Sequence, residues 1–306
     1  MLSVIFYVAL FIYAVVIGSF LNVCILRIPM KETIVSKRSH CMTCGHQLAW
    51  YDLFPLFSYL ALGGKCRYCK AHISKQYPII EATNGILAVL CFVFGGFFPH
   101  TIKYLYQWVD LGNDLQMFDW MQPVFGWIFL LLNAFVCSAL LVITVIDWRT
   151  YTIPFGADVF IFVMGIIKLV LTMIADSRYY CMAQDYLGNT YSTFDKIMAN
   201  GKGLELIIGF FAVSVPLFLI WLFSKGTAMG DGDFKLMAAA GLFLGWKYAL
   251  MALIFGCFYG SVIHLIRMKV SKINHKLAMG PYLAAGIVTA LWFGKPILEW
   301  YVNTFM

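Results

Sequence analysis

Long uninterrupted apolar stretches limit what this chain can fold into. The first, MLSVIFYVALFIYAVVIGSFLNVCIL, contains no charged residue, and several later stretches approach 20 residues. A stretch of this length spans the hydrocarbon layer of a bilayer as a helix. Hydrophobic residues make up 62% of the 306-residue chain and charged residues only 12%, against roughly a quarter in soluble domains. These features predict a polytopic membrane protein, and they exclude a soluble, disordered or collagen-like chain.

The apolar stretches predict an all-α protein with about eight transmembrane helices. Between Lys235 and Lys247, eleven uncharged residues would cover only about 16 Å, roughly half of the hydrocarbon thickness. We keep this segment as a crossing, because a re-entrant segment would move the basic stretch RMKVSKINHK to the other side. The predicted spans are 1–26, 79–98, 124–146, 155–175, 203–223, 236–246, 248–266 and 281–300.

The basic residues predict the orientation. Most of the 22 lysines and arginines fall in the segments 27–78, 147–153, 224–235 and 267–276, which lie on one side in this map. By the positive-inside rule that side is cytoplasmic, and the N-terminus faces outward. No cationic residue precedes the first stretch, so we expect a retained span and not a cleaved signal peptide. The net charge of +7 is thus an orientation signal, and no nucleic-acid partner is expected.

A four-cysteine pattern marks the largest predicted cytoplasmic segment, 27–78. Cys41 and Cys44 form one C-x-x-C pair, and Cys66 and Cys69 form a second pair after 21 intervening residues. Two such pairs are typical of a structural zinc site with four thiolate ligands. The alternative is two disulfides or redox pairs, which a reducing cytoplasm disfavours. We therefore expect zinc to stabilise a segment with little core of its own.

Several acidic residues are predicted at one membrane surface. Asp147 ends the third apolar stretch, Glu81 opens the second, and Asp231 and Asp233 begin the sixth. Two carboxylates that share a site hold one proton between them, so one can activate water while the other protonates the substrate. The flanking Gly230 and Gly232 are expected to permit unusual backbone torsions and close approach of a peptide. The pattern is compatible with an aspartyl protease.

Simpler explanations for these acids remain open at this point. Asp147 could end a span beside Arg149, and Asp231 and Asp233 could be a helix cap and a solvated turn. Intramembrane carboxylates also serve proton relays, so a proton-coupled transporter is the main functional alternative. A third hypothesis is a membrane scaffold without catalytic activity whose zinc loop binds a partner protein.

The order of motifs resembles that of the bacterial type IV prepilin peptidases, which are leader peptidases and N-methyltransferases with a G-x-G-D aspartyl protease signature. The matching segments run along most of the chain in the family's order, and each contains residues that carry the resemblance. They are GSFLNV (18–23), the two cysteine pairs, LAWYDLFPLFSYLALGGKCRYC (48–69), ISKQYPIIEATNG (73–85), IDWRTYTIP (146–154), GDGDFKLMAAAGLFLGW (230–246) and AMGPYLAAG (278–286).

The resemblance implies roles for particular residues. Asp147 and Asp233 match the family's catalytic aspartates, Gly230, Gly232 and Lys235 complete the second motif, and Asp231 occupies its variable position. The implied activity is cleavage of the basic leader of prepilins or pseudopilins at the cytoplasmic face of the bacterial inner membrane. Methylation of the new N-terminus by S-adenosylmethionine would follow, with Glu81 a candidate helper or substrate anchor. A peptidase without methyltransferase activity is the alternative within the family.

These expectations divide the chain into a first helix (1–26), a zinc-binding, methyltransferase-associated loop (27–78) and a peptidase domain of about seven helices (79–306). The outward loops 99–122 and 176–202 are longer than the family pattern, and no function is predicted for them.

Overall fold

The computed structural model describes residues 2–34, 39–94, 108–110, 116–118, 121–187, 201–227, 229–270 and 278–305. Seven of the described helices are long and apolar enough to cross a membrane, so the chain is a multi-pass membrane protein. They are α1 (Leu2–Arg27), α3 (Gln76–Phe94), α5 (Met121–Thr150), α6 (Phe155–Leu187), α8 (Lys202–Phe223), α10 (Trp246–Val270) and α11 (Gly280–Phe305).

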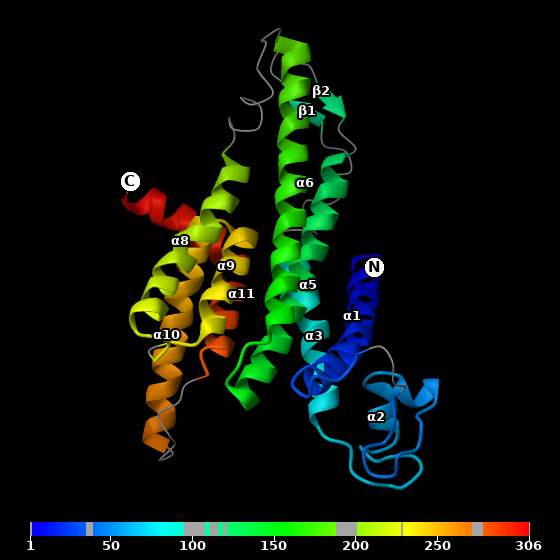
Figure 1. The fold of residues 1–306 in the computed structure, drawn as a ribbon. Helices are drawn as coiled ribbons and strands as arrows, with labels where there is room; N and C mark the ends of the chain where they lie inside the picture. Colours follow the sequence, from blue (N-terminus) through cyan, green and yellow to red (C-terminus); the bar gives the residue numbers. More distant parts are fainter. Residues whose placement is uncertain are drawn as a thin grey trace.

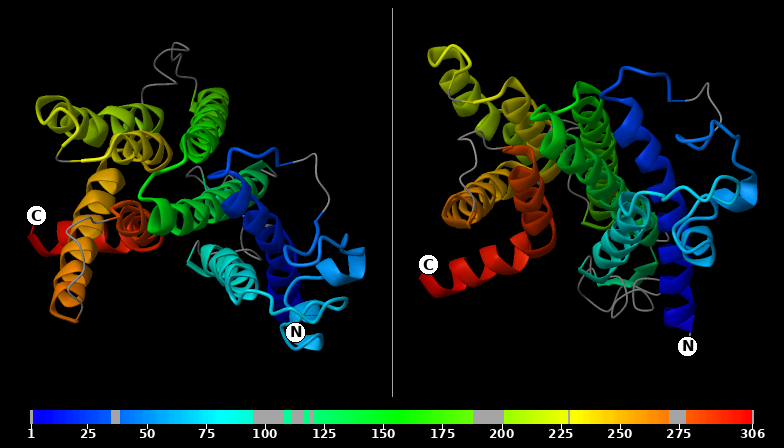
Figure 2. Two further views of the ribbon diagram at one scale, coloured as in Figure 1. Left: turned by 60° about the horizontal axis from the view of Figure 1, so that its bottom comes forward. Right: turned by 90° about the horizontal axis from the view of Figure 1, so that it is seen from below.

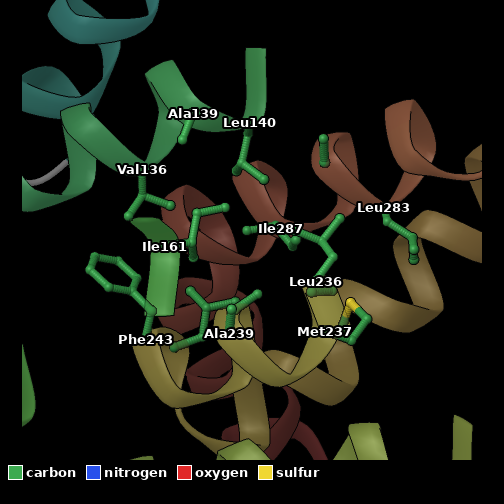
Figure 3. Close-up of a cluster of buried hydrophobic side chains, with 14 of the residues drawn as sticks. Val136, Ala139, Leu140, Ile161, Leu236, Met237, Ala239, Phe243, Leu283 and Ile287 are labelled. Carbon is green, nitrogen blue, oxygen red and sulfur yellow. The ribbon is translucent and has the colours of Figure 1, made fainter. Parts of the chain in front are cut away.

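The helices form two groups that meet at α5 and α6. Helices α1 and α3 pack together against α5, whereas α8, α10, α11 and the shorter α9 (Asp231–Leu244) gather on the other side (Figures 1 and 2). A buried core joins α5, α6, α9 and α11, and side chains from all four interdigitate in Figure 3. The core residues labelled there include Val136, Leu140, Ile161, Leu236, Phe243 and Ile287.

Helix α9 corresponds to the predicted short crossing, and the structure changes its limits. It begins at Asp231, before the predicted start at residue 236, and its 14 residues cover about 21 Å. It is therefore shorter than the seven helices that are long enough to span. At its other end Gly245 has a φ of 90°, and the Lys168 ammonium donates a 2.8 Å hydrogen bond to the Phe243 carbonyl. This half-buried lysine satisfies one of the carbonyls that a helix C-terminus leaves free.

The contacts between α1 and α3 give a physical role to the GSFLNV segment. A Cβ atom on Gly18 would lie 2.8 Å from the Glu81 Cα, so only glycine allows this approach. The Asn22 amide donates to the Tyr77 carbonyl at 3.2 Å. Deeper in the bundle, the Asn84 amide donates to the Ala14 carbonyl at 2.7 Å. Small residues and interhelical hydrogen bonds are the usual means of helix association in lipid.

Two predicted loops contain regular structure. The predicted outward loop 99–122 contains two short antiparallel strands, β1 (Trp108–Asp110) and β2 (Gln116–Phe118). The predicted loop 176–202 was placed too early, because α6 continues to Leu187. Residues 188–200 of that loop lie outside the described residues.

The cysteine loop, residues 27–78, lies at one end of the bundle beside the ends of α1 and α3 (Figure 1). It contains a 3-10 turn (Trp50–Leu53) and the short helix α2 (Phe57–Ala61). Helix α5 ends, and α6, α9 and α11 begin, at this same end of the molecule (Figure 1). We call it the cysteine end of the bundle.

Candidate active site

Asp147 lies in the last turn of α5 and is 4% exposed. Its carboxylate accepts a 2.9 Å hydrogen bond from the backbone N–H of Gly280, the first residue of α11. A helix N-terminus presents unpaired N–H groups and positive potential, which favour a carboxylate in its charged form. Among the ion pairs of the described residues there is none between Asp147 and Arg149, whose guanidinium donates to the Gln76 side chain at 2.5 Å.

Gly280 is a site residue for which the sequence analysis assigned no role. A Cβ atom at this position would lie 2.7 Å from the Asp147 Oδ2 and 3.1 Å from its Cγ. Any larger residue would therefore displace the carboxylate or the start of α11. The Gly-Pro pair at 280–281 is a helix-start signal, but it does not indicate the contact with Asp147.

Asp233 lies in the first turn of α9 and is 7% exposed. Its carboxylate lies close to Gly230, the residue that precedes the helix: the Asp233 Oδ2 is 3.4 Å from the position that a Cβ on Gly230 would take. The positive end of the helix dipole favours an acidic side chain in this first turn. Each predicted catalytic aspartate thus lies beside the start of a helix, which is α11 for Asp147 and α9 for Asp233.

The two aspartate motifs touch through Gly232 and Ile153. A Cβ atom on Gly232 would lie 2.7 Å from the Ile153 Cβ, which belongs to the same segment as Asp147. The charges of Asp147 and Asp233 interact electrostatically. The fold therefore brings the two predicted acids into one neighbourhood, although 85 residues separate them in the sequence.

The predicted torsional role of the glycines is wrong. Gly230 has a φ of −67°, and neither Gly230 nor Gly232 is among the described glycines with positive φ. Gly232 is required because of the close approach of Ile153. At Gly230, the Asp233 carboxylate lies 3.4 Å from the position that a Cβ atom would take.

Asp231 and Lys235 form an ion pair on the surface of α9. The Lys235 ammonium contacts the Asp231 carboxylate at 2.6 Å, and the Asp231 side chain is 65% exposed. Of the two aspartates, only Asp231 thus agrees with the simpler explanation of a solvated helix start. Asp233, two residues away, is buried and takes no part in that pair.

Glu81 connects the helices to the cysteine loop. It is 6% exposed, and its carboxylate accepts a 2.8 Å hydrogen bond from the backbone N–H of Leu56. Leu56 has a φ of 57°, which is unusual for a residue with a side chain, so Glu81 stabilises a strained turn. Its role toward a substrate remains a prediction.

The four predicted ligand cysteines converge in the loop. The sulfur atoms of Cys41, Cys44, Cys66 and Cys69 all lie within 4.8 Å of one another, and those of Cys41 and Cys69 are 3.8 Å apart. A tetrahedral metal with metal–sulfur bonds of about 2.3 Å separates its ligands by about 3.8 Å. Among the described residues, these cysteines form the group that could hold a metal ion, and no histidine joins them.

The two cysteine pairs have the same backbone geometry. The N–H groups of Cys41 and Cys66 donate to the carbonyls five residues later, at 2.9 and 2.8 Å. Hydrogen bonds from the backbone of Cys44 and Thr43 lower the pKa of Cys41 to about 6. At Cys69 the Ala71 N–H acts in the same direction, but burial and neighbouring thiols outweigh it and raise the pKa to about 11. A bound cation would favour thiolates at all four positions.

Asp52 forms hydrogen bonds with side chains next to the second cysteine pair. Its carboxylate accepts hydrogen bonds from the Arg67 guanidinium at 2.7 Å and from the Tyr68 hydroxyl at 3.2 Å. Burial of the Asp52 side chain acts to raise its pKa, but these hydrogen bonds outweigh it and lower the pKa. Asp52 was not predicted as a site residue.

These features define a helical multi-pass membrane protein with two buried aspartates and a four-cysteine cluster at the same end. Residues 12–94 match the Bacterial Peptidase A24 N-terminal domain, and residues 134–265 match the Type IV leader peptidase family. Together the two matches cover more than half of the 306 residues. The chain belongs to the type IV leader peptidase family.

Curated relatives carry the name prepilin leader peptidase/N-methyltransferase. That of Myxococcus xanthus is 30% identical over 86% of this chain, which spans 63% of the relative's length. Those of Burkholderia pseudomallei and Aeromonas hydrophila are each 27% identical, over 93% and 97% of this chain and 84% and 93% of their own lengths. No solved structure is significantly similar to the chain.

Proposed function

We propose that this chain is an aspartyl endopeptidase that removes the basic leader of type IV prepilins or pseudopilins at the membrane surface. The observation that carries the proposal is the joint burial of Asp147, which accepts a hydrogen bond from the first residue of α11, and Asp233, in the first turn of α9, at the cysteine end. The family and the names of the relatives favour this function, and no relative supports the transporter alternative. The substrate's apolar helix would lie in the bilayer, with the leader at this end.

The two aspartates supply a proton donor and a proton acceptor. The charged carboxylate takes a proton from a water molecule, whose oxygen attacks the scissile carbonyl carbon. The protonated carboxyl donates its proton to the carbonyl oxygen. When the tetrahedral intermediate breaks down, the carboxyl that took the water's proton gives it to the amine nitrogen, and the other carboxylate takes a proton back from a hydroxyl of the intermediate. The C–N bond breaks, and the amine leaves as the new N-terminus. The shared proton belongs to the pair and is not assigned to either residue.

The second proposed activity is N-methylation of that new N-terminus, with S-adenosylmethionine as methyl donor. The amine must lose a proton before it attacks the methyl group, and Glu81 is our candidate to anchor it. Glu81→Gln keeps an acceptor for the Leu56 N–H and removes the charge. Mass spectrometry of the processed pilin should then find cleavage retained and methylation reduced. Normal methylation by this variant would remove Glu81 from the proposal.

We also propose that the metal in the cysteine loop is zinc and that its role is structural. The set of four thiolates leaves no open coordination position. From the positive-inside rule we further propose that the loop is cytoplasmic and the N-terminus faces outward. The family supports a place in the bacterial inner membrane. Metal analysis of the purified chain should find about one zinc per chain, and a ratio far below one would contradict the zinc assignment.

The experiment for the peptidase is prepilin cleavage by the purified chain in liposomes. Wild type should shorten the prepilin, whereas Asp147→Asn and Asp233→Asn should leave it intact. Asp231→Asn is the matched control, because Asp231 is exposed and paired with Lys235. It should cleave at close to the wild-type rate. Normal cleavage by both catalytic-site variants would reject the proposal.

A further inference from the structure

A largely apolar groove lies between α6, α8 and α9, beside the first turns of α6 and α9. Its volume is about 590 Å³, and its walls include Phe162 of α6, Val215 and Phe218 of α8, and Phe234 of α9. An apolar cavity of about 150 Å³ accepts benzene, so this groove admits several side chains of that size. Lys235, two residues after Asp233, also lines it. The groove thus adjoins the first turns of α9, the helix that carries Asp233, although neither Asp233 nor Asp147 lines it.

A buried aspartate lies in the wall of this groove. Asp158, in the first turn of α6, lines the groove and is 4% exposed. Neither of its carboxylate oxygens has a hydrogen-bond partner among the described residues. Its charge interacts with those of Lys235, Asp231 and Asp233, which places it near the active site. The Lys235 ammonium is itself bound to Asp231.

A carboxylate without partners at this depth lowers stability, and in membranes such groups usually serve a ligand. The groove requires an occupant that is apolar along its length and offers hydrogen-bond donors at one end. The start of an apolar helix has this chemistry, because its first four N–H groups lack partners within the helix. Aspartate is among the best side-chain acceptors for them. A lipid acyl chain would fill the groove but would offer Asp158 no donor.

We propose that the groove holds the first turns of the substrate's transmembrane helix and that Asp158 caps the free N–H groups of that helix. This inference rests on the proposed function and adds the place where the substrate binds. Asp158 would fix the start of the apolar helix beside Asp233, so that the bond before it lies at the proposed acids. Asp158 is therefore a positioning residue and takes no part in proton transfer.

Photo-crosslinking tests the groove without requiring catalysis. Benzoylphenylalanine is placed at Val215, which lines the groove, or at Ile220, which lies on the same helix outside it; they are 43% and 51% exposed. Both are made in the Asp147→Asn background, in phosphatidylethanolamine–phosphatidylglycerol liposomes with a labelled prepilin. We expect several-fold more prepilin adduct from Val215. Equal yields, or lipid adducts alone from Val215, would overturn the groove as the substrate site.

Variants of Asp158 test the capping role in the active enzyme. Because Asp158→Ala loses the cap, its KM for the prepilin should rise roughly tenfold with kcat nearly unchanged. The KM of Asp158→Asn should stay within about threefold of the wild-type value. Asp158→Ala should also raise the thermal unfolding temperature, because it removes a buried group without partners. An unchanged KM, or a lower unfolding temperature, would overturn the role. Failure of wild type to cleave would count against the proposed function instead.

Discussion

Substitution of Gly280 by alanine should slow the proposed cleavage without unfolding the protein. The added Cβ would lie 2.7 Å from the Asp147 Oδ2, closer than non-bonded atoms approach, so the carboxylate or the start of α11 must move. That movement breaks the 2.9 Å hydrogen bond from the Gly280 N–H. A hydrogen bond to a charged group contributes about 1.5–3 kcal/mol. If the bond is lost in the transition state, kcat should fall about 10- to 100-fold.

The assay is the initial rate of prepilin shortening at saturating substrate in liposomes. Gly156→Ala is the matched control, because no atom lies within 4 Å of the Cβ that it adds to the first turn of α6. The control should cleave at the wild-type rate. Thermal unfolding in detergent should show that both variants are folded. A folded Gly280→Ala protein with wild-type kcat would refute the proposed contribution of the α11 N-terminus.

Three further predictions concern stability. Lys70→Gly should stabilise the cysteine loop by about 1 kcal/mol, because Lys70 has a φ of 59° at the position where the first cysteine pair has Gly45. The temperature at which the loop releases its bound metal measures this change. Release at a lower temperature than in wild type would contradict the prediction. Asp52→Asn should speed proteolysis of the loop about two- to fivefold. Because the pKa of Asp52 is lowered, its contribution is lost only on acidification below about pH 4, so the ratio of rates should be constant from pH 8 to pH 5. Gly241→Ala should destabilise the fold by about 1–3 kcal/mol, since its Cβ would lie 2.1 Å from the Gly209 carbonyl oxygen; an unchanged unfolding temperature would contradict this.

The sequence predicted the parts of this protein that depend on composition and spacing. Apolar stretches gave the long helices, because a bilayer requires a minimum length of apolar helix. The spacing of Cys41, Cys44, Cys66 and Cys69 gave the four-sulfur cluster, since two short pairs suffice for tetrahedral ligation. The limits of α9 were less accurate, because charged residues at its first turn reduce hydropathy although they are favourable at a helix start.

Contacts between distant segments were not predictable in the same way. Nothing near Gly280 in the sequence shows that its missing Cβ makes room for Asp147, and nothing near Gly232 points to Ile153. The burial of Asp158 without a partner among the described residues emerges only when α6, α8 and α9 come together. Tertiary packing decides such features, and one sequence does not carry that information by itself.

The claim that Asp147 and Asp233 work as one unit is tested most directly by the kcat of the double variant. Each single asparagine substitution should lower kcat for prepilin cleavage by at least about 10⁴-fold, since residues that act together lose most of their effect with either partner. The Asp147→Asn/Asp233→Asn double variant should then be no slower than the slower single variant. A double variant whose loss equals the product of two modest single losses would show that the aspartates act independently, and would contradict the account.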